Sequence, residues 1–119
     1  MNNILIVDDS AFMRRMMSDV VTKNGYNIVG EAENSLTAVE RYKELRPDIV
    51  TMDITMRGGS GLEALASILA FDPNANVVMV SSISQEIVVR EAIMLGAKGF
   101  IVKPFDEKQI IAAFTNLFK

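Results

Sequence analysis

Four short apolar or β-branched runs in this chain each end at a charged or hydroxyl-bearing residue. The runs are Ile4–Val7 before Asp8 and Asp9, Ile49–Met52 before Asp53, Val77–Val80 before Ser81, and Phe100–Val102 before Lys103. Runs of this length and composition are typical of buried strands. In open α/β sheets, ligands bind just beyond the carboxyl ends of the strands. The sequence therefore predicts one charged pocket at one edge of a sheet.

Strand-like and helix-like segments alternate along the whole chain, roughly every 20–25 residues, which is the period of βα units. We predict a single α/β domain over residues 1–119, with a doubly wound, five-stranded parallel sheet flanked by five helices. In the flavodoxin-like strand order 2-1-3-4-5, strands 1 and 3 are neighbours. The strand ends that carry Asp8 and Asp53 would then meet. Tyr26–Ala32 is a weaker strand, with Gly30 and Glu31 in it, and is predicted at an edge.

Helix starts and inward faces follow from capping residues and from the spacing of apolar side chains. Ser10, Ser84 and Asp106 are predicted to cap the first, fourth and fifth helices. We expect Arg14 and Arg15 on a solvated face of the first helix. Its core-facing stripe is predicted to comprise Phe12, Met13, Met16, Met17, Val20 and Val21.

The composition argues against several classes of partner and chemistry. The net charge is −3, so nucleic acid and an anionic membrane are not expected as main partners. No apolar stretch approaches the ~18 residues of a membrane span, and no secretion signal is recognisable. The chain has no cysteine, which suits the cytoplasm, our expected location. It also has no histidine, so any imidazole base or phosphohistidine must come from another molecule.

The chemistry of the predicted pocket follows from its charges. Three carboxylates in one crevice repel each other, which either raises their pKa values or requires a cation. A hard divalent ion with oxygen ligands fits, and Mg²⁺ is the usual choice beside a phosphoryl group. Lys103 and Ser81 can donate to phosphoryl oxygens, and an aspartate can itself be the nucleophile. The residues therefore favour Mg²⁺-dependent phosphoryl transfer.

Over essentially its whole length the chain resembles the receiver domains of two-component response regulators. The resemblance rests on family order and spacing of Asp8, Asp9, Asp53, Met56, Gly61, Ser81, Phe100, Lys103 and Pro104. Within the family it is most similar to the stand-alone CheY-like regulators, because no output domain follows. The resemblance implies a phosphoacceptor signalling protein, not an enzyme that turns over a substrate.

The resemblance also implies a role for each matched residue. Asp53 would accept the phosphoryl group from a phosphohistidine, and Lys103 would bind that group. Ser81 and Phe100 would move together as the switch, and the Lys103–Pro104 peptide bond would be cis. The implied Mg²⁺ ligands are Asp8, Asp9, Asp53 and the backbone carbonyl of Thr55.

Partners are implied in the same way. A histidine kinase or phosphotransfer protein would supply the phosphoryl group, within chemotaxis signalling. A downstream protein would bind the face formed by the fourth helix, fifth strand and fifth helix. Candidate apolar contacts there are Ile87, Val88, Met94 and Phe118. We expect a monomer.

The segment after Asp53 departs from the family pattern. Arg57 stands where the family usually has proline, and Gly58 and Gly59 follow. Proline fixes φ and glycine frees it, so we expect a looser and more basic loop. Thr55 and Ile83 occupy the positions that influence phosphoryl lifetime in the family. Neither is charged, so we expect slow self-dephosphorylation, with a partner phosphatase ending the signal.

Two other functions are compatible with the residues. One is a phosphorelay intermediate that passes the phosphoryl group to another histidine. The other is an aspartyl-phosphate phosphatase of the haloacid-dehalogenase type. Those enzymes carry a general-acid aspartate two residues after the nucleophile, where this chain has Thr55.

Overall fold

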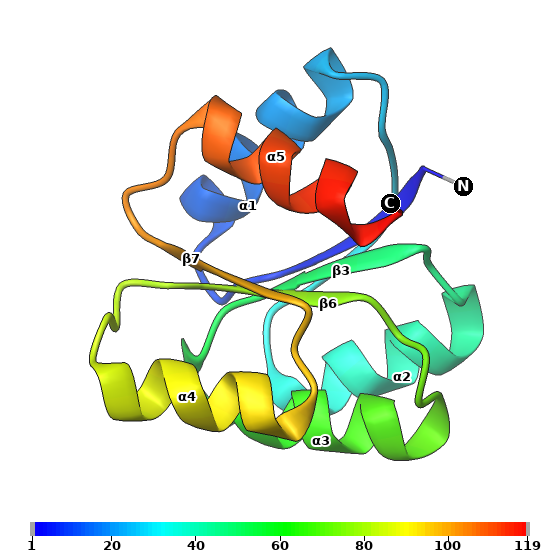
Figure 1. The fold of residues 1–119 in the computed structure, drawn as a ribbon. Coiled ribbons are helices and arrows are strands. Elements are labelled where there is room, and N and C mark those ends of the chain that lie inside the picture. The colour runs from blue at the N-terminus through cyan, green and yellow to red at the C-terminus, as the bar shows by residue number, and fades with distance from the viewer. Residues whose placement is uncertain (1, 119) are drawn as a thin grey trace.

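A five-stranded parallel sheet with helices on both faces forms the body of the molecule (Figure 1). The computed structural model describes residues 2–118. The sheet contains β1 (Asn3–Val7), β2 (Asn27–Ala32), β3 (Ile49–Met52), β6 (Val77–Ser81) and β7 (Gly99–Val102). The helices are α1 (Ala11–Lys23), α2 (Ser35–Leu45), α3 (Gly61–Phe71), α4 (Glu86–Leu95) and α5 (Glu107–Leu117). A separate small hairpin pairs β4 (Thr55–Met56) with β5 (Gly59–Ser60).

The strand order confirms the flavodoxin-like prediction. The order is β2-β1-β3-β6-β7, which is 2-1-3-4-5 once the hairpin strands are set aside. All neighbouring pairs in the sheet are parallel. The strand with Gly30 and Glu31 lies at an edge, as predicted. The most buried strands, β1, β3 and β6, are central, where both faces are covered.

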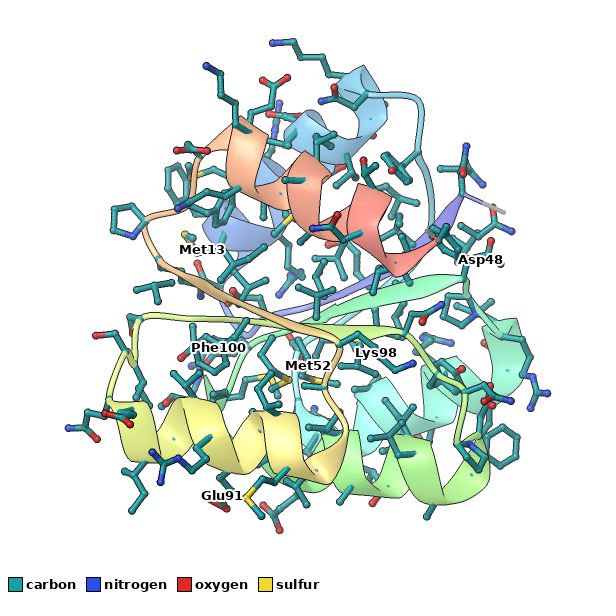
Figure 2. The ribbon with its side chains drawn as sticks, in the orientation of Figure 1. Met13, Asp48, Met52, Glu91, Lys98 and Phe100 are labelled. Atoms are coloured by element: carbon teal, nitrogen blue, oxygen red, sulfur yellow. The ribbon has the colours of Figure 1, made fainter. Side chains whose placement is uncertain are left out.

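Two apolar layers hold the helices to the sheet. Successive side chains of a strand point to opposite faces, so Ile4 and Ile6 contact one layer while Leu5 and Val7 contact the other. Figure 1 shows α1 and α5 on one face and α2, α3 and α4 on the other. Met52 lies in the layer beneath the sheet, and Glu91 lies on the outer side of α4 (Figure 2).

The predicted inward stripe of α1 is too wide. Met17 and Val21 are buried, but Phe12 is 71% exposed and Met16 is 38% exposed. The prediction of core positions for Phe12 and Met16 is therefore wrong. Helical spacing defines an apolar face, but it does not show where the covering sheet and α5 stop.

Two of the three predicted helix caps are confirmed. The Ser10 hydroxyl accepts from the Met13 N–H at 3.2 Å, and Asp106 forms a capping box with Gln109. The cap at Ser84 is wrong, because α4 begins at Glu86 after Gln85, which makes no side-chain capping bond. Among residues 2–118, no helix combines the length and apolar character needed to cross a membrane.

Candidate functional site

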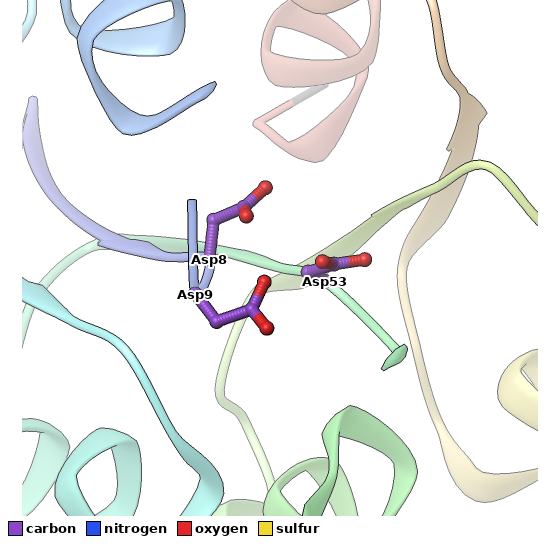
Figure 3. A group of neighbouring side chains, drawn as sticks. All are labelled: Asp8, Asp9 and Asp53. Carbon is purple, nitrogen blue, oxygen red and sulfur yellow. The ribbon is translucent and has the colours of Figure 1, made fainter. Parts of the chain in front are cut away.

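Three carboxylates converge at the carboxyl edge of the sheet. Each of Asp8, Asp9 and Asp53 offers an oxygen, and these oxygens all lie within 4.8 Å of one another. Figure 3 shows the three side chains as neighbours just beyond the ends of β1 and β3. Asp8 and Asp53 are each 6% exposed, and Asp9 is half-buried. The convergence predicted from the strand ends is therefore present.

Strand register brings these carboxylates to the same level. β1 and β3 pair side by side, with Val7 opposite Met52, so the next residues along each strand leave the sheet together. The Asp53 N–H donates to the Val7 carbonyl at 3.0 Å and continues the ladder one step further. Ser10 N–H donates to Asp8 Oδ1 at 2.9 Å and fixes that carboxylate at the start of α1.

Lys103 supplies positive charge to two of the three carboxylates. Its Nζ lies 2.7 Å from Asp8 Oδ2 and 3.4 Å from Asp53 Oδ2, and its side chain is 14% exposed. The Lys103 N–H donates to the Ser81 carbonyl at 2.8 Å, which ties the end of β7 to that of β6. The Lys103–Pro104 peptide bond is cis, as the resemblance implied.

Burial dominates the electrostatics of Asp53. Removal from water raises the pKa of this carboxyl above its ordinary value, and the neighbouring Asp8 charge raises it further. Lys103 and the Ile54 N–H, which donates to Asp53 Oδ1 at 2.8 Å, oppose this change in the pKa. A cation bound nearby would therefore stabilise the charged form of this carboxylate.

The two proposed switch residues lie on neighbouring strands. Ser81 is fully buried at the end of β6, and its hydroxyl oxygen accepts from the Ile83 N–H at 3.1 Å. Phe100, on β7, is half-buried and packs against the apolar layer between the sheet and α2–α4. In the register, Ser81 is opposite Val102, two residues beyond Phe100.

The segment after Asp53 is an ordered hairpin in the structure. Thr55 pairs with Ser60 and Met56 with Gly59, so a tight antiparallel turn replaces the loose loop that the glycines suggested. Gly58 and Gly59 have φ of 82° and 146°, which allow this turn. Thr55 is exposed.

Gly61 allows the hairpin to return close to Asp53. A Cβ built on Gly61 would lie 1.8 Å from the Asp53 carbonyl oxygen and 2.8 Å from its carbonyl carbon. The Gly61 N–H donates to the Ile54 carbonyl at 2.7 Å. Only a residue without a side chain fits there, so Gly61 helps to position the backbone of Asp53.

The contacts of two arginines at the site were not predicted. Arg14, expected on a solvated face, is largely covered: its guanidinium donates to the Asp8 carbonyl at 2.7 Å and to Glu31 Oε1 at 2.8 Å. That expectation was wrong, although Arg15 is exposed as predicted. Arg57 contacts Asp9, with its N–H 3.2 Å from Oδ2. The sequence signal for Arg14 was its position one helical turn after Ser10, the residue that follows Asp8 and Asp9.

Comparisons with known proteins agree with this geometry. The chemotaxis protein CheY of Thermotoga maritima is 52% identical over 116 residues, covering 98% of this chain and 97% of that protein. The chemotaxis protein CheY of Bacillus subtilis is 51% identical and covers 97% and 96%. A chain in the crystal structure of the CheX–CheY–BeF₃–Mg²⁺ complex from Borrelia burgdorferi superposes with a TM-score of 0.96 at 39% identity, covering 98% of this chain and 89% of that chain.

The chain also matches a model of a whole protein family. The family model of the response regulator receiver domain matches residues 4–115. The sheet order and the relatives, which are half identical over nearly their full length, agree with that match. The chain belongs to the response regulator receiver domain family.

Proposed function

We propose that this chain is a phosphorylation-controlled binding switch that accepts its phosphoryl group on Asp53. One observation carries the proposal: Asp53 lies within 4.8 Å of two further carboxylates and 3.4 Å from the Lys103 ammonium. An acceptor carboxylate, a place for a cation and a fixed positive charge are the parts that phosphoryl transfer needs.

The donor set fits Mg²⁺, a hard cation that prefers carboxylate and carbonyl oxygens. Asp8, Asp9, Asp53 and the Thr55 carbonyl would hold it. When bound, the ion would neutralise charge on the phosphoryl oxygens. Lys103 neutralises part of the cluster and would bind another phosphoryl oxygen.

The proposed transfer balances without a general acid or a histidine from this chain. A carboxylate oxygen of Asp53 forms a bond to phosphorus while the P–N bond of a phosphohistidine on a partner kinase breaks. The electron pair of that bond leaves with the imidazole nitrogen. The product is an acyl phosphate on Asp53, and the partner histidine is returned neutral or takes up a proton from water.

Ser81 and Phe100 would convert this local change into a new surface. The Ser81 hydroxyl, now bonded to the Ile83 N–H, would turn to the phosphoryl oxygens, and Phe100 would move further inward. The affected face contains α4, β7 and α5, where Ile87 is 76% exposed and Met94 is 81% exposed. A downstream protein would bind there.

The relatives support chemotaxis signalling as the setting, since several carry that name. The proposed location is the cytoplasm. The receiver domain itself, residues 1–119, would be the signalling unit, acting as a monomer. Thr55 and Ile83 carry no charge to orient a water, so the acyl phosphate would persist until a partner phosphatase removes it. A phosphoryl half-life of seconds in the isolated protein would contradict this.

The experiment measures phosphoryl stoichiometry with a small acyl phosphate as donor and Mg²⁺ present. A switch takes up one phosphoryl group per chain and turns over a generic phosphate monoester no faster than buffer does. Many monoester turnovers per chain, lost in Asp53→Asn, would contradict the switch and favour the phosphatase. Removal of Mg²⁺ by a chelator should prevent labelling.

A further inference from the structure

Arg57 forms a second cationic contact with the acidic cluster. Its backbone N–H donates to Asp9 Oδ2 at 3.2 Å, and its guanidinium Nε lies 3.8 Å from the same oxygen. The residue stands at the tip of the β4–β5 hairpin, two residues past the Thr55 carbonyl. Backbone and side chain of one residue therefore both face a single carboxylate oxygen.

Lys103 and Arg57 pair with different carboxylates of the acidic cluster. Lys103 pairs with Asp8 and Asp53. Within residues 2–118, Arg57 is the cationic residue that pairs with Asp9. Asp9 and Arg57 also line a hollow of about 220 Å³ together with Glu33 and Asn34. That hollow opens beside Asp9, so a hydrated cation can approach this carboxylate from the same side as the guanidinium.

The Arg57 side chain is free to leave Asp9. It is 89% exposed, and the 3.8 Å ion pair is long. An exposed pair of this kind has a small free energy, so a stronger ligand for Asp9 displaces the guanidinium readily. Lys103, at 14% exposed and 2.7 Å from Asp8, is held much more firmly.

We propose that Arg57 competes with the divalent cation for Asp9 and so weakens metal binding by the unphosphorylated protein. This inference rests on the proposed metal site. A cation bound to Asp9 Oδ2 repels the guanidinium beside that oxygen, so each weakens the binding of the other. Because such coupling is reciprocal, metal binding releases Arg57 from Asp9 at the hairpin tip.

The test is a calorimetric titration of MgCl₂ into the unphosphorylated wild type and two Arg57 variants. Arg57→Gln removes the charge and keeps the backbone N–H, and we expect it to bind Mg²⁺ about three- to fivefold more tightly. Arg57→Lys keeps the charge and should remain near the wild type. The difference between wild type and Arg57→Gln should shrink as salt rises, because the competing charge is exposed.

The control is Arg41→Gln, which removes the same charge from α2, where Arg41 pairs with Glu44. We expect its Mg²⁺ affinity to match that of the wild type. A second readout is the Arg57 Nε–H NMR signal, which should shift toward that of a free arginine as Mg²⁺ saturates the protein.

Two outcomes would overturn the inference and separate it from the proposed function. Equal or weaker Mg²⁺ binding by Arg57→Gln, or an equal gain in Arg41→Gln, would exclude competition at Asp9 while leaving the metal site intact. Absence of Mg²⁺ binding by the wild type and every variant would overturn the metal site itself.

Discussion

At the scale of single residues, the site is a group of charges held close together by backbone geometry. Asp8 and Asp53 are buried with one lysine between them, and Asp9 shares the same space. Burial places the Asp53 carboxylate in a less favourable environment than the unfolded chain provides. A bound cation, or the loss of one aspartate charge, would therefore stabilise the folded protein.

Asp53→Asn should stabilise the metal-free protein at neutral pH. Because the folded-state pKa of Asp53 is raised above the ordinary 3.8, the native protein takes up a proton before the unfolded chain does. Above the raised pKa, the Asp53 charge therefore lowers the free energy of unfolding by its full amount. This loss of stability disappears as the pH falls toward 3.8. Urea unfolding across this range should show the stability advantage of Asp53→Asn shrinking with acidification.

Asp72→Asn is the control of opposite sign. The Tyr42 hydroxyl donates to Asp72 at 2.7 Å and lowers the pKa of that carboxyl. The Asp72 charge therefore contributes stability above its unfolded pKa, and that contribution is lost as the pH falls through the lowered folded pKa. Asp72→Asn should destabilise at neutral pH. Equal effects of the two substitutions would contradict the electrostatic assignment.

Gly61→Ala should disrupt the backbone beside the acceptor. The added Cβ would meet the Asp53 carbonyl at 1.8 Å, so the chain must shift, at a cost of roughly 3 kcal/mol in the free energy of unfolding. Gly99→Ala is the control, since its Cβ would make only ordinary contact with Val78 at 3.5 Å. Denaturant midpoints measure both. Similar midpoints for the two variants would contradict the close approach.

The sequence predicted the site residues that directly follow strands, but it did not predict the contacts of Arg14 on α1 or of Arg57 in the hairpin turn. Asp8, Asp53 and Lys103 could be assigned to one site because the carboxyl ends of parallel strands lie at the same edge of a sheet. This holds whatever the side-chain packing. The contact of Arg57 with Asp9 depends on the hairpin turn at Gly58 and Gly59, which no apolar pattern specifies.

At the scale of elements, the helices are ordered by their caps and by the layers that cover them. Ser10, Ser60 and Asp106 each accept from a backbone N–H in the first turn of their helix. The start of α4 lacks such a bond at Gln85. The prediction of a cap at Ser84 failed because a side chain can cap a helix only from the residue directly before its first turn, which is Gln85 here.

Asp106→Ala should lower the free energy of unfolding by about 1 kcal/mol, the usual loss for an N-cap with a capping box. Gln85→Ala removes no capping bond and should leave the stability nearly unchanged. Thermal unfolding followed by circular dichroism compares the two. A loss at Gln85 as large as that at Asp106 would show that the side-chain bond is not the cause.

The apolar stripe of α1 shows what patterns at this scale leave open. Spacing identified Met17 and Val21 correctly, but it assigned Phe12 and Met16 to the core as well. The strands and α5 cover a narrower face than the sequence stripe suggests. How far a neighbouring element extends is a property of tertiary packing, which periodicity within one helix does not contain.

At the scale of the whole molecule, topology turns separate segments into one site. Strands β1, β3, β6 and β7 lie in neighbouring positions, so residues from Asp8 to Lys103 meet at one edge (Figure 1). Composition predicted that the most apolar strands are central, and the flavodoxin-like arrangement predicted their order. The proposed binding face on α4, β7 and α5 adjoins that edge through Ser81 and Phe100.

Intact-mass analysis after incubation with a small acyl phosphate and Mg²⁺ shows directly whether Asp53 is the acceptor. The wild type should gain the mass of one phosphoryl group, and Asp53→Asn should gain none. Asp48→Asn, which alters an aspartate at the opposite end of β3, should label like the wild type. Labelling of Asp53→Asn to the same extent as the wild type would contradict the assignment of Asp53 as the acceptor.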